Sequence, residues 1–367
     1  MSSPQLSLCG FFCASAMVLT ACGGGNSSHS SAMASYVATS LVTDVNTSTN
    51  PYKAANTDPN LVNAWGLAFN PNGFVWVANN HTSTSTLYDG TGVPQTLVVA
   101  IPDGSAGDAS PTGIVFNGTQ SFKVTQGGVT GASAFIFAGE AGTLAGWSPS
   151  VNLNSAITAY DGAAAGSAYF GLAIGSMAGV DFLYATDFHG GTVDVFDSNF
   201  AKVSVTGGFT DAALPTGYAP FGIQTIGGLV YVAYAKQDPN SSDEVAGAGL
   251  GVIDTFDAAG KLVARLIPAG GKLNAPWGMA MAPSNFGPFS NALLVANFGD
   301  GKVNAFDPAS GAFLGTLAKA GGSPIVIDGL WGIAFGNGIN GQPTNTLFYT
   351  AGPAGESHGV YGRIDSR

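Results

Sequence analysis

Six short runs of one kind recur along the chain, each with a glycine that follows Trp, Phe or Thr and precedes Leu, Ile or Met. The glycines are Gly66, Gly113, Gly171, Gly222, Gly278 and Gly332. They stand 47 to 58 residues apart, a period that suits one four-stranded β-propeller blade and is too long for leucine-rich, ankyrin or tetratricopeptide repeats. The spacing therefore predicts an all-β, six-bladed β-propeller.

Further strand signals follow each glycine in a fixed order. The second strand of each unit is short and rich in aromatic and β-branched residues, as strands are; these runs are 74–78, 134–138, 182–185, 229–233, 293–296 and 347–350. The third strand ends in an Asp in five units, and we interpret this Asp as closing its own turn. These residues are Asp89, Asp197, Asp257, Asp307 and Asp365. Fourth strands are expected, for example, at 95–101, 202–207, 261–267 and 312–317.

The last unit has no fourth strand, because only Ser366 and Arg367 follow Asp365. An unpaired strand edge is a liability for a folded protein. A strand-like run at 36–43 precedes the first blade and has no other assignment. We expect it to pair with the last blade and close the ring, so that residues 36–367 form one propeller domain.

The N-terminal residues have the pattern of an export signal. Residues 8–21 are apolar, but this stretch is too short to span a bilayer. They end in Leu19-Thr20-Ala21-Cys22, which looks like a bacterial lipobox and precedes a Gly/Ser/Asn-rich tether. We predict a lipoprotein signal peptide at 1–21, lipidation of Cys22 and a tether at 22–35. Because no Lys or Arg precedes Lys53, an ordinary secretory signal stays open.

Either signal predicts an exported protein, and the lipobox predicts a bacterial lipoprotein anchored to a membrane in the periplasm or at the cell surface. The net charge is −11, with 22 acidic and 11 basic residues, which argues against a nucleic-acid partner. The three cysteines, Cys9, Cys13 and Cys22, all precede the propeller, so it has no thiol nucleophile or disulfide. We expect a monomer that touches the membrane only through its lipid and binds an unidentified protein or small molecule.

Two blades carry insertions, at 117–133 in the second blade and at 236–249 in the fourth. The latter is unusually charged for this chain and includes Lys236, Asp238, Asp243 and Glu244. Long loops on a propeller rim are either functional lips or tolerated decoration, and the sequence leaves both interpretations open.

The repeat units resemble six-bladed propellers of the NHL type. More closely, they resemble an uncharacterised family of secreted bacterial propeller proteins, some of which carry a PEP-type C-terminal sorting tail. The runs that carry the resemblance are 60–68, 76–80, 86–90, 142–147 and 358–364. The resemblance implies the fold and export, and it implies no activity. This chain ends at Ser366-Arg367 without such a tail, and the lipobox would replace that anchor.

Three of the four histidines, His81, His189 and His358, each follow the second strand of a blade. Three imidazoles around an open position form a catalytic zinc site, and a propeller lyase acting on peptidyl hydroxyglycine is similar in using channel histidines. The alternative is that they are separate polar loop residues. We expect His189 and His358 near the channel mouth and His81 turned outward.

Oxygen-bearing side chains recur at matched positions after the second strands: Asn79 with Asn80, Glu140, Asp187, and Asn297 with Asp300. Such ligands suit Ca²⁺, as in the calcium-dependent lactonase-type propellers that this arrangement loosely resembles. Asn and Asp are also the residues that tight turns need, so a purely structural role explains them equally.

Five of the six residues before the repeat glycines are aromatic: Trp65, Phe170, Phe221, Trp277 and Trp331. They form either a stacking collar for a planar ligand or wedges packed between blades. The leading hypothesis is a non-enzymatic, lipid-anchored envelope propeller that presents one face to a ligand or partner. The alternative is a hydrolase or lyase that uses zinc or calcium at the channel mouth, so both enzymatic activity and cofactor stay open.

Overall fold

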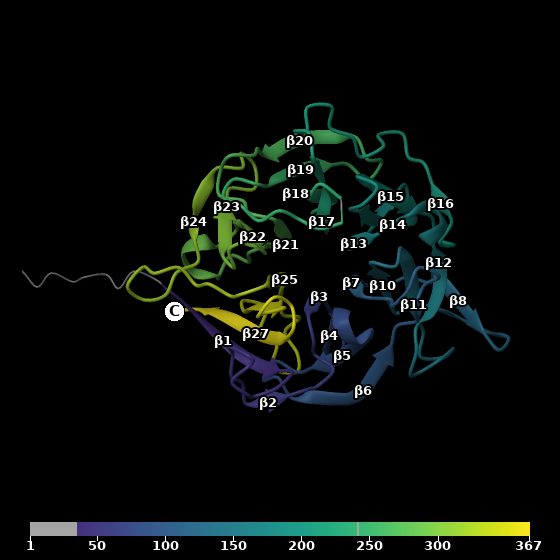
Figure 1. Ribbon diagram of the computed structural model, residues 1–367, viewed down its shortest axis with the longest axis horizontal. Coiled ribbons are helices and arrows are strands. Elements are labelled where there is room, and N and C mark those ends of the chain that lie inside the picture. Colours follow the sequence, from purple (N-terminus) through teal and green to yellow (C-terminus); the bar gives the residue numbers. More distant parts are fainter. Residues whose placement is uncertain (1–34, 241) are drawn as a thin grey trace, which may run out of the picture. The chain divides into compact units, whose positions relative to one another are not determined.

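The computed structural model describes residues 35–240 and 242–367, which belong to a compact unit that spans Ala34–Arg367. In this unit six sheets, antiparallel apart from one short parallel pair in the last blade, surround a central axis, as expected for a six-bladed β-propeller (Figure 1). The predicted signal peptide, Cys22 and nearly all of the tether lie outside the described residues. Within the described residues, no helix is long and apolar enough to cross a membrane.

Each blade is named here from its inner strand outward. Blade one contains β3 (Ala64–Phe69), β4 (Val75–Asn79), β5 (Thr84–Tyr88) and β6 (Pro94–Ala100). Blade two contains β7 (Pro111–Phe116), β10 (Phe135–Gly139), β11 (Thr143–Trp147) and β12 (Ile157–Asp161). Blade three contains β13 (Tyr169–Met177), β14 (Val180–Asp187), β15 (Thr192–Phe196) and β16 (Lys202–Val203).

The second half of the ring repeats this order. Blade four contains β17 (Tyr218–Ile226), β18 (Leu229–Lys236), β19 (Val252–Phe256) and β20 (Leu262–Ile267). Blade five contains β21 (Pro276–Met281), β22 (Leu293–Asn297), β23 (Val303–Phe306) and β24 (Phe313–Thr316). Blade six contains β25 (Leu330–Phe335), β26 (Leu347–Ala351), β27 (Val360–Ser366), β1 (Tyr36–Thr43) and β2 (Asn56–Thr57). The described residues also include three short 3₁₀ helices, η1 (Asn80–Thr82), η2 (Ala163–Ala165) and η3 (Gly287–Phe289).

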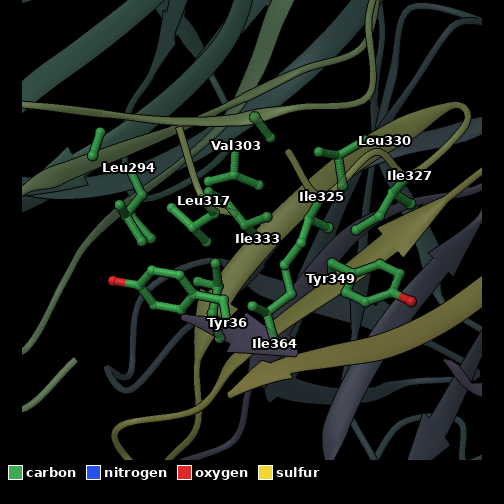
Figure 2. Packing of buried hydrophobic residues seen from close by; sticks show 14 of the residues in the cluster. Tyr36, Leu294, Val303, Leu317, Ile325, Ile327, Leu330, Ile333, Tyr349 and Ile364 are labelled. Carbon is green, nitrogen blue, oxygen red and sulfur yellow. The ribbon is translucent and has the colours of Figure 1, made fainter. Parts of the chain in front are cut away.

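The predicted closure of the ring by the N-terminal strand is confirmed. β1 pairs antiparallel with β27, from Tyr36 opposite Ser366 to Thr43 opposite Val360. Tyr36 is 2% exposed and its hydroxyl donates to the Phe286 carbonyl at 2.9 Å. Figure 2 shows the Tyr36 ring among apolar side chains of blades five and six. The closing strand therefore supplies both a hydrogen-bonded ladder and part of the core between the last two blades.

The repeat glycines lie where neighbouring inner strands approach each other most closely. A Cβ atom added at Gly222 would lie 2.1 Å from the Trp277 carbonyl oxygen. A Cβ atom added at any of the other five repeat glycines would also lie within 3.0 Å of a backbone atom of the next inner strand. These distances are 2.5 Å from Gly66 to the Thr112 oxygen, 2.3 Å from Gly113 to the Leu172 nitrogen, 2.9 Å from Gly171 to the Phe221 oxygen, 2.5 Å from Gly278 to the Trp331 oxygen and 2.6 Å from Gly332 to the Trp65 oxygen, each measured from the added Cβ. Contacts this short exclude any side chain, which explains why glycine recurs once per blade.

The outer strand of blade three is shorter than the sequence predicts. A strand is expected at 202–207, whereas β16 ends at Val203. The chain then leaves blade three, because the Gly207 amide donates to the Ala259 carbonyl and the Phe209 amide to the Gly260 carbonyl, both in a turn of blade four. In blade two, the insertion at 117–133 forms a hairpin of β8 (Lys123–Gln126) and β9 (Val129–Ala132).

The aspartates that end the third strands close turns, as predicted, in four of the five units. Asp89 Oδ1, for example, accepts the backbone amides of Thr91 and Val93. Asp197, Asp257 and Asp307 accept amides of their own turns in the same way. Asp365 instead pairs with Arg363 and accepts a hydrogen bond from Thr346.

Candidate functional site

The loops that precede the inner strands and the loops between second and third strands meet at the same end of the ring. In blade one this follows from the register, since Ala64 at the start of β3 lies opposite Asn79 at the end of β4. We call this end the upper mouth and define it by Asn63, Asn80, His81, Glu140, Asp243, Glu244 and Glu356. The opposite end, where the inner strands finish, is the lower end.

A row of side-chain hydrogen bonds crosses the upper mouth. Asn63 Nδ2 donates to Glu356 Oε2 at 2.6 Å and to Asn80 Oδ1 at 3.3 Å. Asn80 Nδ2 in turn donates to Glu140 Oε1 at 2.6 Å. Both asparagines are buried, and the Asn80 amide nitrogen also donates to the Asn63 carbonyl at 3.0 Å. Two buried amides of blade one thus hold one carboxylate from blade six and one from blade two.

The charged insertion of blade four brings two more carboxylates to this mouth. Gln237 Nε2 donates to the Phe188 carbonyl at 2.6 Å, and the Gly247 amide donates to Asn274 Oδ1 at 2.6 Å. These two contacts anchor the loop between them, which carries Asp243 and Glu244. The insertion therefore forms a lip that adds acidic groups to the upper mouth.

The carboxyl groups of the upper mouth influence one another electrostatically. Burial, together with the smaller effect of the charges of Asp243, Glu356 and Glu140, raises the pKa of Glu244 to about 8. Burial likewise raises the pKa of Glu356 to about 7, with Glu140 and Asp243 acting in the same direction. The pKa of Glu140 is also raised, by desolvation first, although its side chain keeps access to solvent. Among residues 35–240 and 242–367, none of these carboxylates forms a salt bridge.

The three glutamates of the upper mouth are the only glutamates in the 367-residue sequence. The other 19 acidic residues are all aspartates. Glu140, Glu244 and Glu356 come from three blades, and each lies in the loop between the second and third strand of its blade. Glutamate side chains, which are longer than aspartate side chains, therefore occur only at this end of the channel.

Aromatic side chains form a floor beneath the upper mouth. Trp331 stacks on Trp65 with ring centroids 3.7 Å apart and on Phe298 at 4.0 Å. Trp331 Nε1 donates to Asn63 Oδ1 at 3.2 Å, which joins the floor to the polar row above it. Trp65 is 3% exposed, and its indole N–H has no hydrogen-bond partner among the described residues.

All five aromatic residues proposed as a ligand collar belong to this floor. They are Trp65, Phe170, Phe221, Trp277 and Trp331. Their rings pack on one another, for example Trp65 on Phe170 at 5.5 Å, and Trp277 Nε1 donates to the Phe170 carbonyl at 2.9 Å. The cluster therefore separates the upper mouth from the channel below.

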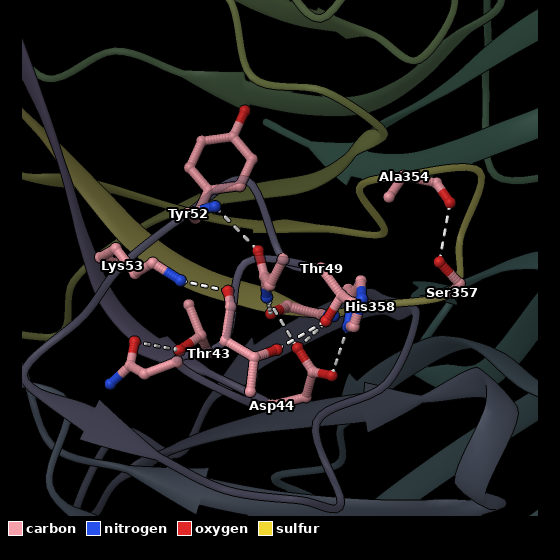
Figure 3. Close-up of polar contacts among 12 residues, drawn as sticks. Thr43, Asp44, Thr49, Tyr52, Lys53, Ala354, Ser357 and His358 are labelled. Carbon is pink, nitrogen blue, oxygen red and sulfur yellow. Dashed lines mark hydrogen bonds and ion pairs between the residues drawn. The ribbon is translucent and has the colours of Figure 1, made fainter.

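The three histidines have different surroundings. His81 Nε2 lies 3.4 Å from Asn63 Nδ2 at the upper mouth, and burial lowers the pKa of His81. His358 Nδ1 lies 2.7 Å from Asp44 Oδ2, so this ring fastens the segment after β1 to blade six (Figure 3). His189 follows β14 and is exposed. Across the part of the chain that the structure describes, no group of three or more His, Cys, Asp or Glu side chains is arranged to hold a metal ion.

The His81 side chain is exposed to solvent, but it stays in contact with Asn63 at the mouth. Its loop is held at the mouth, because the His81 amide donates to the Val62 carbonyl and Thr82 Oγ1 donates to the Asn60 carbonyl. The Thr-rich sequence after His81 suggests a mobile loop, but these hydrogen bonds to the entry loop of β3 fix it.

Of the proposed calcium ligands, only Glu140 and Asn80 reach the upper mouth. Asn79 donates to Thr84 and Thr86 within blade one. The side chains of Asp187 and Asn297 instead form hydrogen bonds with the loops that precede and follow the strands of their own blades. Asp187 Oδ1 accepts the Ala168 and Gly190 amides, and Asn297 Nδ2 donates to the Lys272 carbonyl and to Asp300 Oδ1.

Asn63 and Glu356 belong to the site but were not predicted from the sequence. A usable signal was present, because the scarcity of glutamate together with its position after second strands singles out Glu140, Glu244 and Glu356. Asn63 carried no comparable signal. Its role depends on a contact with Glu356, which lies 293 residues away in the sequence.

Comparison with solved structures supports the fold class. The chain aligns with the PQQ-bound aldose sugar dehydrogenase of Streptomyces coelicolor with a TM-score of 0.50 and 12% identity, covering 92% of this chain and 99% of that one. It also aligns with virginiamycin B lyase of Staphylococcus aureus with a TM-score of 0.44 and 14% identity, covering 83% and 97%. At such identities the likeness shows the fold alone, and the protein is a six-bladed β-propeller.

Sequence relatives define the family. No family model matches this chain. It is 35% identical over 318 residues to an uncharacterised protein of Acanthamoeba polyphaga mimivirus, covering 85% of this chain and 77% of that protein. A second uncharacterised protein of the same virus is 34% identical over 293 residues, covering 77% and 75%. The chain belongs to the family of these mimivirus proteins. Neither relative supports the bacterial origin that the resemblance implied.

Proposed function

We propose that this protein is an exported, lipid-anchored binding propeller whose upper mouth takes up an organic cation. The observation that carries the proposal is the convergence of Glu140, Glu244 and Glu356 from three blades, with no basic side chain of the described residues paired to them. The lipobox that ends at Cys22 supports export and anchoring in a bacterial cell envelope.

The chemistry of the upper mouth favours a positively charged ligand. Neighbouring carboxylates repel one another, and partial burial makes their charged forms less stable. The raised pKa values of Glu244 and Glu356 reflect both effects. A cation held between these groups would remove the repulsion and form charge-assisted hydrogen bonds, which are the stronger kind. The ligand would lie against the polar row of Asn63 and Asn80, and the buried Trp331 supports this row from below through its hydrogen bond to Asn63.

The spacing of the carboxylates favours an extended organic cation over a single metal ion. Glu356 and Glu140 are each bonded to a different amide, so two side chains of blade one lie between them. A molecule with two separated ammonium groups matches this arrangement. The zinc- or calcium-dependent hydrolase or lyase is the alternative, and no observation favours it.

Calorimetric titration of the full chain with 1,5-diaminopentane tests the proposal. We expect saturable binding of one ligand, weakened about tenfold or more in Glu140→Gln and in Glu356→Gln, because a hydrogen bond to a charged group contributes about 1.5–3 kcal/mol. Asp108→Asn removes an exposed carboxylate outside this cluster and is the matched control. No binding, or equal affinity in all four proteins, would refute the proposal. Stoichiometric zinc or calcium in the purified protein would favour the alternative.

A further inference from the structure

Blade three has an incomplete outer strand, and this leaves part of its third strand uncovered. β16 contains only two residues, which pair with Val195 and Phe196 of β15. The outer strands of blades one, two, four and five contain four to seven residues. Thr192, Val193 and Asp194 therefore pair with β14 on one side and with no strand on the other. We call these three residues the open edge; Figure 1 shows β16 at the outer side of this blade, beside β15.

The backbone groups of Val193 point toward the uncovered side. In an antiparallel ladder, the N–H and C=O groups of alternate residues point to the same neighbouring strand. The Asp197 amide donates to the Ala201 carbonyl at 2.9 Å, on the side of β16. Two residues earlier, Val195 pairs with Val203 of β16. Val193 is the next residue in this alternation, and among residues 35–240 and 242–367 no backbone group pairs with it on this side.

A groove of about 420 Å³ lies beside the open edge. It is lined by residues 192–195 of β15 on one side and by residues 202–205 and Gly208 on the other. The chain leaves β15 after β16, because the amides of Gly207 and Phe209 donate to carbonyls in a turn of blade four. The groove therefore lies between the open edge and the segment that moves away from it. Unpaired strand edges of this kind are templates for pairing with another chain.

The other blades show what covers the equivalent edge. Val193 is the second residue of its strand, and the corresponding residues are Ser85 in blade one and Ile253 in blade four. They pair with Val99 and Ile267 of the outer strands, which are 0% and 3% exposed. An apolar residue of an extended chain thus covers this position in both blades. The same chemistry, an extended chain with an apolar residue opposite Val193, fits the groove of blade three.

The charged side chains of the groove already have partners. Lys202 Nζ lies 2.6 Å from Asp194 Oδ2, and the Tyr169 hydroxyl donates to the same oxygen at 2.8 Å. A further charge in the groove would have no counter-ion there, so its composition favours uncharged side chains. Thr192 is exposed at the end of the open edge, where a threonine on an added strand would form a favourable cross-strand pair.

We propose that the open edge binds an extended, uncharged peptide segment of another protein, which adds antiparallel to β15 as an outer strand. The Val193 amide donates to a carbonyl of the peptide, and the Val193 carbonyl accepts the amide of the same peptide residue. The apolar side chain of that residue takes the place that Val99 and Ile267 have in blades one and four. None of the residues that define the upper mouth lines the groove, so this site does not depend on the proposed cation site.

Calorimetric titration of the full chain with the neutral peptide acetyl-Ser-Thr-Val-Thr-Ser-amide tests the proposal. The matched control peptide carries a methyl group on the valine amide nitrogen, which removes the donor to the Val193 carbonyl. We expect the first peptide to bind saturably and the methylated peptide to bind about tenfold more weakly or less, because a hydrogen bond is lost and a carbonyl stays unpaired. Hydrogen exchange of the Val193 amide should slow when the first peptide saturates the protein. Equal affinity for the two peptides, or no saturable binding, would overturn the proposal.

Two variants test the location of the site. Val193→Pro removes the outward amide, and proline is tolerated in an edge strand where its nitrogen faces away from the ladder; this variant should lose binding. Val193→Ala keeps the amide and should bind the peptide about as tightly as the wild type. If melting temperatures show that Val193→Pro fails to fold, the methylated peptide decides with the wild-type protein. Unchanged binding in a folded Val193→Pro protein would overturn the proposal. A dimer that forms without peptide and that Val193→Pro dissociates would assign the open edge to a second copy and overturn the proposed partner.

Discussion

Substitution of a repeat glycine tests why glycine recurs once in every blade. In Gly222→Ala the new Cβ would lie 2.1 Å from the Trp277 carbonyl oxygen, 2.7 Å from its carbonyl carbon and 2.9 Å from its Cα. All three are backbone atoms, so no side-chain rotation relieves the clash. Ordinary carbon contacts are about 3.5–4.0 Å, so the inner strands of blades four and five must separate by about 1 Å.

The expected cost follows from this geometry. Overpacking a close-packed interior costs about 1–3 kcal/mol, and we expect the upper end because a closed ring transmits the displacement to its other junctions. For a domain of this size about 1 kcal/mol corresponds to about 2 °C in melting temperature. Gly222→Ala should therefore melt about 6 °C below the wild type.

Gly271→Ala is the matched control. The nearest atom to its added Cβ is the Pro268 carbonyl oxygen at 4.0 Å, and its φ lies outside the left-handed region. Such a replacement stabilises by about 0.4–1 kcal/mol through the unfolded chain, so this variant should melt slightly above the wild type. Thermal and urea unfolding of the three proteins decide the matter. Equal melting temperatures for the two variants would refute the close-approach explanation.

Three further predictions follow from closure, anchoring and pH. Deletion of residues 36–44 removes the pairing of β1 with β27 and should destabilise the whole ring; a soluble truncated protein with an unchanged melting temperature would contradict this. Cys22→Ala should move the protein out of the detergent phase, because durable attachment needs acyl chains at about 0.8 kcal/mol per buried CH₂; full retention there would disprove lipidation. The folded state binds protons at Glu356 and Glu244 more tightly than the unfolded state, since their pKa values are raised to about 7 and about 8. Their contribution to stability is therefore greatest below about pH 4.5 and is lost as pH rises through 8. Urea unfolding of Glu244→Gln should show a weaker decline over this window, and an identical pH profile would argue against the raised pKa.

The fold was predictable because its strongest constraints are local. Close approach of backbones at each blade junction permits only glycine, so the repeat appears in the sequence as Gly66 and its five equivalents. The missing outer strand of the last blade likewise made the pairing of β1 with β27 predictable. The end of β16 was not predictable, since it depends on hydrogen bonds from Gly207 and Phe209 to a neighbouring blade.

The site was predictable only in part, because it depends on how the loops of different blades face one another. Glu140 was singled out as an oxygen ligand, and the 236–249 loop as either a lip or decoration. The row from Glu356 through Asn63 and Asn80 requires three-dimensional contacts that no local pattern encodes. The histidines illustrate the opposite case. His81 and His358 occupy equivalent positions in the repeat, but their side chains contact unrelated partners.

The most direct test of the account is the response of the Asn63 and Asn80 side-chain amides to a cation, followed by nuclear magnetic resonance. These two amides donate to Glu356 and Glu140, so a ligand held by the carboxylates must change their environment. During titration with 1,5-diaminopentane, both amide signals should shift and saturate at the same ligand concentration. The Asn304 amide, which donates to the Lys272 carbonyl in blade five, should not move. Asn63 and Asn80 signals that stay unchanged, or that drift without saturating, would contradict a cation site at the upper mouth.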